Sequence, residues 1–266
     1  MSRFFRHPEL LGLLLLPLFL ASTPARAQDT FEVQVYEYET VPRGMWNLET
    51  HFNYTMRGST AYEGSVAPTN HQAHLTFELT RGITDHFELA GYLVFAHRPG
   101  AGAEYVAYRI RPRVSVPEAW GWPVKVSLST EVGFPKSTYE AAHSTLEIRP
   151  IVEKGFGKFT VDVNPTLGRA LSGPGSDEGW DMEPGARVGY AVSPKVDLSL
   201  EYYGSLGSVT DPLPADQATH LLFPGADISL GDGRVLNVGI GGNLTDAGIQ
   251  SMVKLRLGWL FGGSGK

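Results

Sequence analysis

The stretch YVAYRIRPRVSV, residues 105–116, carries two interleaved sets of side chains. One set is apolar and consists of Val106, Tyr108, Ile110, Pro112, Val114 and Val116. The other contains Arg109, Arg111 and Arg113. Because successive side chains of a strand point to opposite faces, a strand here has one apolar face and one face with three guanidinium groups. The class of protein depends on which face points inward.

Alternation with a period of two residues recurs from Met45 onward, and helical periodicity is not evident. It predicts an all-β fold of about twelve strands, at residues 45–56, 72–80, 86–96, 104–116, 123–134, 144–153, 158–169, 180–191, 195–205, 219–230, 234–243 and 250–261. Connections such as VSPK and GDG are short, whereas RGSTAYEGSVAPTN and LGSVTDPLPADQ are long and polar. Tight turns at one end and long loops at the other are typical of outer-membrane β-barrels.

The central part of the apolar face has no Asp, Glu, Lys or Arg in any predicted strand, and aromatic residues gather near strand ends. A soluble exported sandwich or lipocalin-like barrel would alternate too, with the apolar face as its core. Strands of about 9–11 residues suit a tilted bilayer crossing, whereas globular strands average about 5–6. An arginine facing lipid near the midplane costs about 2–4 kcal/mol. The pattern therefore favours an antiparallel up-and-down transmembrane β-barrel with its arginines in the lumen.

Five prolines fall on the apolar register within predicted strands: Pro112, Pro150, Pro165, Pro184 and Pro224. Proline has no amide proton for a ladder, and a closed barrel offers no edge strand to accommodate it. We expect bulges or local irregularities at these positions.

Residues 1–27 have the features of a cleaved signal peptide, with Arg3 and Arg6 before an apolar run and ARA at residues 25–27. We expect the mature chain to begin at Gln28. Without the four charged residues of this peptide, the chain has 19 basic and 27 acidic residues and a net charge of −8. This charge argues against a nucleic-acid partner. The absence of cysteine excludes a disulfide scaffold.

The charged face is expected to line the lumen. On one wall it carries Glu147, Arg149, Asp162, Asn164, Glu183, Arg187 and Glu201. Asp227 belongs to the predicted strand that lies opposite the three arginines in a ring of twelve. One interpretation is a salt-bridged network that satisfies polar groups inside a closed barrel. The alternative is a constriction with a transverse field between the arginines and acids on the far wall.

A smaller polar cluster is expected on the first two strands, where Glu49 and His51 share the inner face with His74 and Glu78. Hairpin pairing would bring His51 near Glu78. A metal or proton-sensitive site is one interpretation. Ordinary polar lining is the interpretation we favour, so we predict no metal and no cofactor.

Motifs of catalysis are lacking, since the chain has no G-x-S-x-G and no H-E-x-x-H. We therefore predict no catalytic residues and no enzyme activity. A lipid-acting outer-membrane enzyme is the less favoured alternative.

The last predicted strand ends in VKLRLGWLF, residues 253–261, and resembles the C-terminal strand that barrel-insertion machinery reads in bacterial outer-membrane proteins. In that group the chain usually stops on the aromatic residue. Here GGSGK follows, and we expect residues 262–266 to form a flexible tail.

Three longer stretches resemble a known family: FEVQVYEYETVPRGMWNLETHFNY, HLTFELTRGITDHFELAGYL and LEIRPIVEKGFGKFTVDVNPTLGR. They are similar to uncharacterised Gram-negative outer-membrane β-barrels grouped with the outer-membrane component of phenol-degradation (MetA-pathway-like) systems. The resemblance implies a barrel of about twelve strands and passage of small hydrophobic or aromatic molecules.

We therefore expect a barrel at residues 45–261 in the Gram-negative outer membrane, with both chain ends in the periplasm. Residues 28–44 would lie in the periplasm or enter the lumen, as a plug, at the mouth, or as an extra strand. The expected function is a passive or facilitated channel for small molecules. The alternative is a structural or interaction barrel with an occluded lumen. The expected partners are outer-membrane lipids, the insertion machinery and a small solute.

Overall fold

The computed structural model describes residues 31–263, whose regular structure is almost entirely β-strand. The strands are β1 (Met45–Arg57), β2 (Ala73–Thr84), β3 (Phe87–Arg98), β4 (Gly102–Ser115), β5 (Lys125–Pro135), β6 (Ser144–Phe156), β7 (Phe159–Asn164), β8 (Leu167–Ser172), β9 (Asp181–Met182), β10 (Gly185–Ser193), β11 (Val196–Ser205), β12 (Thr219–Gly231), β13 (Arg234–Asn243) and β14 (Ser251–Gly262). A short 3-10 helix, η1 (Glu118–Trp120), follows β4. The predicted signal peptide and the last three residues of the predicted tail lie outside the described residues.

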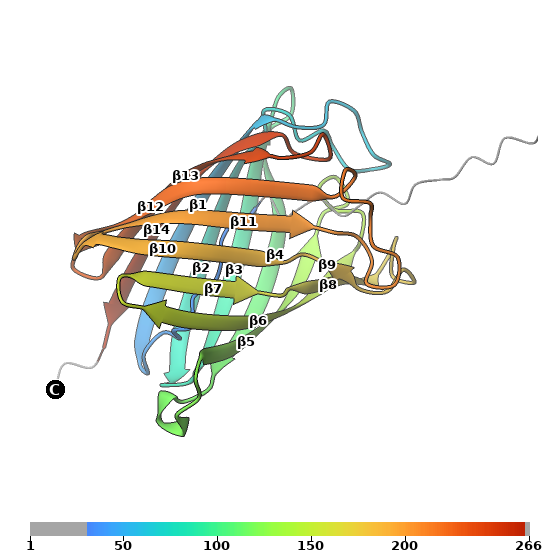
Figure 1. Cartoon of the computed structure of the whole chain (residues 1–266). Coiled ribbons are helices and arrows are strands. Elements are labelled where there is room, and N and C mark those ends of the chain that lie inside the picture. The colour runs from blue at the N-terminus through green and yellow to red at the C-terminus, as the bar shows by residue number, and fades with distance from the viewer. Residues whose placement is uncertain (1–30, 264–266) are drawn as a thin grey trace, which may run out of the picture.

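The strands form one closed antiparallel barrel (Figure 1). The order runs from β5 through β1 and β14 to β6, and pairing of β5 with β6 closes the ring. β7 and β8 both pair with β6 and are two parts of one crossing, as are β9 and β10. Twelve crossings result, which confirms the predicted fold. Within residues 31–263 no helix has the length and hydropathy needed to cross a bilayer.

The two ends of the barrel differ. At one end, here called the turn end, strands are joined by connections as short as residues 157–158, 194–195 and 232–233, and Met45 pairs with Gly262. At the other, here called the loop end, the connections include residues 58–72 and 206–218. This asymmetry agrees with the alternating connection lengths in the sequence.

The outer surface of the barrel is apolar. Leu93, Ile110, Leu200 and Ile240 expose about half of their side chains there. Tyr108 and Phe134 stack with ring centroids 4.6 Å apart. A closed barrel with such an outer face is covered by lipid, because every backbone polar group of a strand finds its partner within the sheet. The protein is accordingly an outer-membrane protein of the Gram-negative type.

One residue of the opening stretch faces the wrong way for a strict alternation. β3 and β4 contain a bulge at which Val94 pairs with Ala107 and Phe95 with Tyr105, so that Val106 is left over. Val106 is fully buried, and Tyr105 contacts Phe95 edge-to-face instead. The prediction that Val106 faces lipid is therefore wrong, because the extra residue of a bulge reverses the alternation beyond it.

The prolines interrupt the sheet as expected. Pro165 separates β7 from β8, and Pro184 separates β9 from β10. Pro112, Pro150 and Pro224 each keep their pairing with one neighbouring strand and lie at a gap in the pairing with the other. A residue without an amide proton supports one ladder better than two. The predicted local irregularities are confirmed.

Candidate functional site

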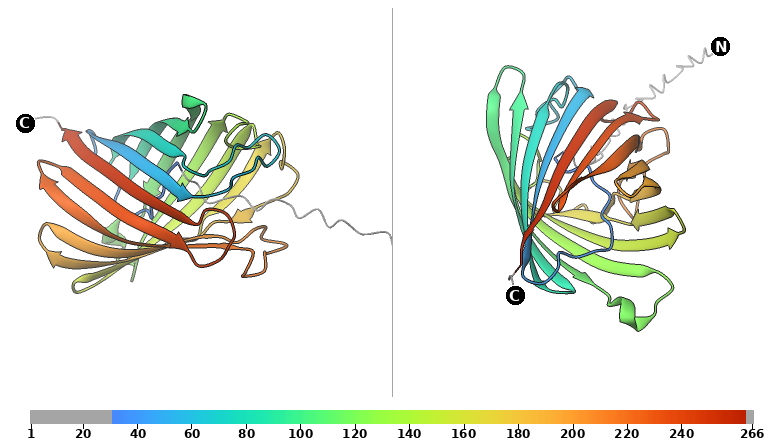
Figure 2. Two further views of the ribbon diagram at one scale, coloured as in Figure 1. Left: turned by 90° about the horizontal axis from the view of Figure 1, so that it is seen from above. Right: turned by 90° about the vertical axis from the view of Figure 1, so that its left-hand side faces the viewer.

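The inside of the barrel is occupied by residues 31–44, which we call the luminal segment. The segment runs through the barrel interior, blue in Figure 2. Phe31 packs against Tyr139 in the connection between β5 and β6, at the loop end. The amide of Gly44 donates to the carbonyl of Gly82 at the turn end. The segment thus traverses the lumen lengthwise. Its first described residue, Phe31, lies at the loop end, whereas the C-terminal strand β14 finishes at the turn end.

Wall side chains hold the main chain of the luminal segment. Asn164 accepts a hydrogen bond from the amide of Tyr36 at 2.7 Å and donates one to its carbonyl at 3.0 Å. Further main-chain contacts come from the wall residues Thr76, Glu88, Arg113, Arg149, Glu153 and Lys254. Residues 31–44 themselves contain no strand. The segment is therefore bound by side chains and does not extend the sheet.

Two apolar patches on the inner wall contact the luminal segment. Val33 and Val35 pack against Tyr203, Leu221 and Phe223, with Ile249 and Met252 completing that cluster. On β3 and β4 a second cluster centres on Tyr92, Val94 and Val106, with Phe31 packed against it. In a ring of twelve crossings, β4 lies opposite β12. The lumen therefore has apolar surface on two facing walls.

The three predicted arginines of β4 all point inward, and their partners are on neighbouring strands and on the luminal segment. Arg111 contacts Glu78 and Glu88, the latter at 2.9 Å. Arg113 pairs with Glu88 at 2.8 Å, and Arg109 with Glu131 at 3.2 Å. The guanidinium groups of Arg111 and Arg113 also lie over the ring of Tyr36.

On the wall opposite β4, the acidic residue Asp227 has cationic partners of its own. Asp227 accepts from Arg187 at 2.8 Å and lies 3.8 Å from Arg256. Asp227 lies on β12, opposite β4 as expected, but Arg187 and Arg256 on nearer strands already pair with it. The structure favours the salt-bridged network of the two interpretations.

The remaining predicted lumen residues lie as follows. Arg149 pairs with Glu147 at 2.8 Å, and Arg187 with Asp162 at 3.3 Å. Glu201 contacts Lys254, which also lies near Tyr203. Glu183 lies at the break between β9 and β10, where its amide donates to Thr166. Strands on both sides of the lumen thus contribute to the network.

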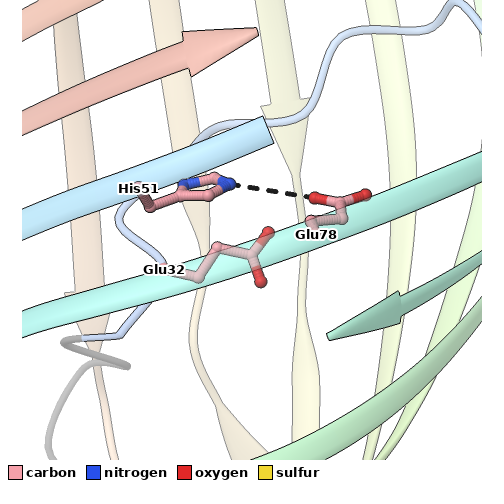
Figure 3. A group of neighbouring side chains, drawn as sticks. All are labelled: Glu32, His51 and Glu78. Atoms are coloured by element: carbon pink, nitrogen blue, oxygen red, sulfur yellow. Dashed lines mark ion pairs between the residues drawn. The ribbon is translucent and has the colours of Figure 1, made fainter. Parts of the chain in front are cut away.

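The polar cluster predicted on the first hairpin is reassembled by the luminal segment. His51 Nε2 lies 3.4 Å from Glu49 Oε2 and 3.8 Å from Glu78 Oε2. Glu32 reaches the same point from the segment (Figure 3), and ligand atoms of Glu32, His51 and Glu78 lie within 4.8 Å of one another. His74 contacts Gln72 at 2.9 Å, and the ring of Phe31 packs on its ring at a tilt of 46°. The hairpin places His51 near Glu78 as expected, but His74 is not part of the group.

A cavity of about 510 Å³ remains beside the luminal segment at the turn end. It is bordered by Glu37 and Thr40 of the segment and by Arg187, Asp227 and Arg256 of the wall. Lys195 of the turn between β10 and β11 and Arg234, the first residue of β13, line it as well. The lumen is therefore accessible from the turn end and filled further inside.

At the loop end, Tyr139 forms a small polar group with two charged residues of β3 and β4. Its hydroxyl donates to Glu104 at 2.7 Å, and Arg98 pairs with the same carboxylate at 2.8 Å. Burial and the hydrogen bond to Glu104 raise the pKa of Tyr139 to about 12. The phenol therefore remains a hydrogen-bond donor at neutral pH.

Sequence reasoning missed the residues that the luminal segment contributes, above all Glu32 and Tyr36. FEVQV, residues 31–35, alternates like a strand, so the sequence leaves open whether this part of the chain enters the lumen, lies at its mouth or pairs as an extra strand. The alternation of VKL, residues 253–255, predicts an inward-facing Lys254, but its contact with Val33 depends on the path of the luminal segment. Alternation of apolar and polar residues gives the position of a segment only when that segment pairs in a sheet, and the luminal segment does not.

No family model matches the chain, and no curated protein matches it in sequence. Among solved structures the chain is similar to the KdgM porin, with a TM-score of 0.54 and 6% identity over 81% of this chain and 99% of that chain. It is also similar to Omp33 of Acinetobacter baumannii, with a TM-score of 0.46 and 9% identity over 84% and 100% of the two chains. The similarity to the KdgM porin supports the β-barrel fold. The narrower resemblance to the phenol-degradation group is not shown by these similarities.

Proposed function

We propose that the protein is an outer-membrane channel for small solutes and that the luminal segment controls passage through it. The observation that carries this proposal is the way the segment is bound. It fills a polar lumen, yet it takes no part in the sheet and is held by wall side chains. Its departure would leave all twelve crossings paired.

The energetic balance favours a closed state from which the luminal segment is released at times. Water entering the lumen would replace the segment's hydrogen bonds to the wall, so each bond contributes only about 0.5–1.5 kcal/mol net. Burial of Val33 and Val35 stabilises the closed state by roughly 1.5–3 kcal/mol each. The closed state therefore predominates, and the wall remains intact in the open one.

The cargo proposed here is a small molecule with an apolar or aromatic body and a polar group. Support comes from the two apolar patches, which would face the open lumen beside the network of arginines and carboxylates. A structural or interaction barrel is the alternative, and it requires that the segment never leaves.

Conductance across a planar bilayer tests the proposal. A variant without residues 31–43 should show a steady current, whereas the full chain should be closed or open only in bursts. A synthetic peptide of residues 31–44 added to the deletion variant should reduce the current, and a scrambled peptide of equal composition should not. If the deletion variant folds, as heat-modifiable gel mobility reports, and still carries no current, the channel proposal is wrong.

Insertion through the barrel-insertion machinery is proposed as well. β14 alternates and carries Trp259 and Phe261 close to its end at Gly262, with ring centroids 4.7 Å apart. Replacing Phe261 with Ser should slow assembly in cells and leave the stability of the assembled barrel nearly unchanged.

A further inference from the structure

Three side chains from separate elements converge at the centre of the lumen (Figure 3). Glu32 belongs to the luminal segment, His51 to β1 and Glu78 to β2. Each exposes 3% or less of its surface, and their ligand atoms lie within 4.8 Å of one another. An imidazole with carboxylates is a donor set that zinc uses in proteins.

Two atoms of the group lack hydrogen-bond partners. Within residues 31–263, His51 Nε2 and Glu78 Oε2 are buried and form no hydrogen bond. The 3.8 Å between them exceeds the usual length of such a bond, which is about 3 Å. Buried polar atoms of native proteins nearly always have a partner, and a bound ion can serve as that partner. Both atoms point into the space that Glu32 borders.

The second oxygen of each of the two carboxylates, Glu32 and Glu78, already contacts a neighbouring side chain. Carboxylates that bind metals have such contacts as well. Glu78 Oε1 accepts from Thr80 at 2.7 Å and also contacts Arg111. Glu32 Oε1 accepts from the hydroxyl of Tyr36. Such contacts fix the orientation of a ligand, and their loss typically weakens metal binding about 10–100-fold.

Arginines offset part of the charge of the group. Arg109 lies 3.7 Å from Glu32 Oε2 and Arg111 contacts Glu78, and each also pairs with a further carboxylate, Glu131 and Glu88 respectively. Glu49 Oε2 lies 3.4 Å from His51 Nε2 and brings a further carboxylate to the same point, while Arg256 pairs with Glu49 Oε1 at 3.0 Å. The group therefore offers carboxylate oxygens and an imidazole nitrogen at one point.

The geometry points to a binding site for a divalent transition-metal ion, with Zn²⁺ as the preferred ion, formed by Glu32, His51 and Glu78 with Glu49 beside them. Calcium prefers six to eight oxygen ligands and magnesium retains several waters, so a small N/O donor set suits neither. Because Glu32 lies on the luminal segment and the other ligands on the wall, the ion would tie the segment inside the barrel. Metal binding stands on this geometry alone, whereas its effect on passage rests on the proposed channel function.

Cobalt titration of the purified full-length barrel in detergent tests the site. After treatment with chelator, Co²⁺ should produce visible absorption bands of a low-coordinate site, and Zn²⁺ should abolish them. Glu32→Gln, His51→Gln and Glu78→Gln should each weaken binding at least tenfold. His74→Gln is the matched control, because His74 is equally buried on the same hairpin but contacts Gln72 instead. Since Glu32 lies outside the sheet, its variant keeps the test valid should the wall variants misfold.

The outcomes separate the site from the channel. Absence of cobalt bands in the wild type, or bands that persist in all three variants, would overturn the site. Bands lost in these variants but kept in His74→Gln would establish it. If the metal binds and Zn²⁺ leaves the current of the full chain unchanged, the site holds and its effect on passage fails. If no metal binds while deletion of residues 31–43 opens the barrel, the channel function holds and the site fails.

Discussion

Asn164 shows how one side chain can position a chain segment that has no sheet partner. Its amide pairs with both the amide and the carbonyl of Tyr36, as a neighbouring strand would do. Asn164 points inward by the strand alternation of β7, as the buried Asp162 two residues before it does.

Replacing Asn164 with Ala should release the luminal segment more often. Loss of two hydrogen bonds at about 0.5–1.5 kcal/mol each raises the open fraction on the order of tenfold. Because the chain has no cysteine, a Val35→Cys reporter can measure this as the rate of labelling by a maleimide. Asn243→Ala is the control, since Asn243 contacts His220 and Ala247 at the loop end. Equal labelling rates in the two variants would show that Asn164 does not hold the segment.

At the level of single residues, the sequence predicts which face a side chain points to better than it predicts which residues that side chain contacts. Arg109, Arg111 and Arg113 face inward because lipid exposure would cost too much, and that reasoning needs only the strand period. Their partners include Glu32 and the main chain of Glu37, which belong to a segment whose path no period reveals. The same limit applies to His51, whose neighbours on β1 and β2 could be inferred and whose third neighbour could not.

Among the elements, the approach of the luminal segment to β2 is closest at Gly82. A Cβ atom added there would lie 2.1 Å from the carbonyl oxygen of Pro42 and 2.4 Å from that of Val41. Glycine is therefore needed for the segment to pass, whereas the strand itself would accept alanine.

Gly82→Ala should consequently displace the base of the luminal segment and increase the current of the full chain, with the barrel retained. Gly91→Ala on β3 is the matched control, because a Cβ there meets nothing within 4 Å. Bilayer recordings of both variants, beside their gel mobility with and without heating, make the comparison. A closed Gly82→Ala barrel that behaves like Gly91→Ala would contradict the role given to this contact.

The elements themselves could be predicted almost to their ends, because alternation and turn residues are local signals. The exceptions are local as well. The bulge turns the side chain of Val106 inward, and no proline or glycine at this position indicates the bulge in the sequence. Irregularities at Pro165 and Pro184 could be predicted from the prolines themselves. The sequence did not predict that each proline would divide a crossing into two short strands.

For the whole molecule, the predicted barrel and its lipid-facing surface are confirmed. The structure adds to this prediction that the luminal segment fills the lumen. A lumen lined by ion pairs and filled by residues 31–44 suits either a channel that opens or a barrel that stays closed. The two differ in a single respect, which is whether the luminal segment must leave its place for solutes to pass.

A reversible crosslink measures that difference most directly. A Cβ at Gly185 would lie 3.5 Å from a γ-methyl group of Val35, so sulfur atoms at these two positions are within reach of each other. The variant Val35→Cys with Gly185→Cys should carry no current when oxidised and regain bursts of current when reduced, while Val35→Cys alone should respond to neither condition. Equal current in the oxidised and reduced double variant would show that the luminal segment does not gate the barrel.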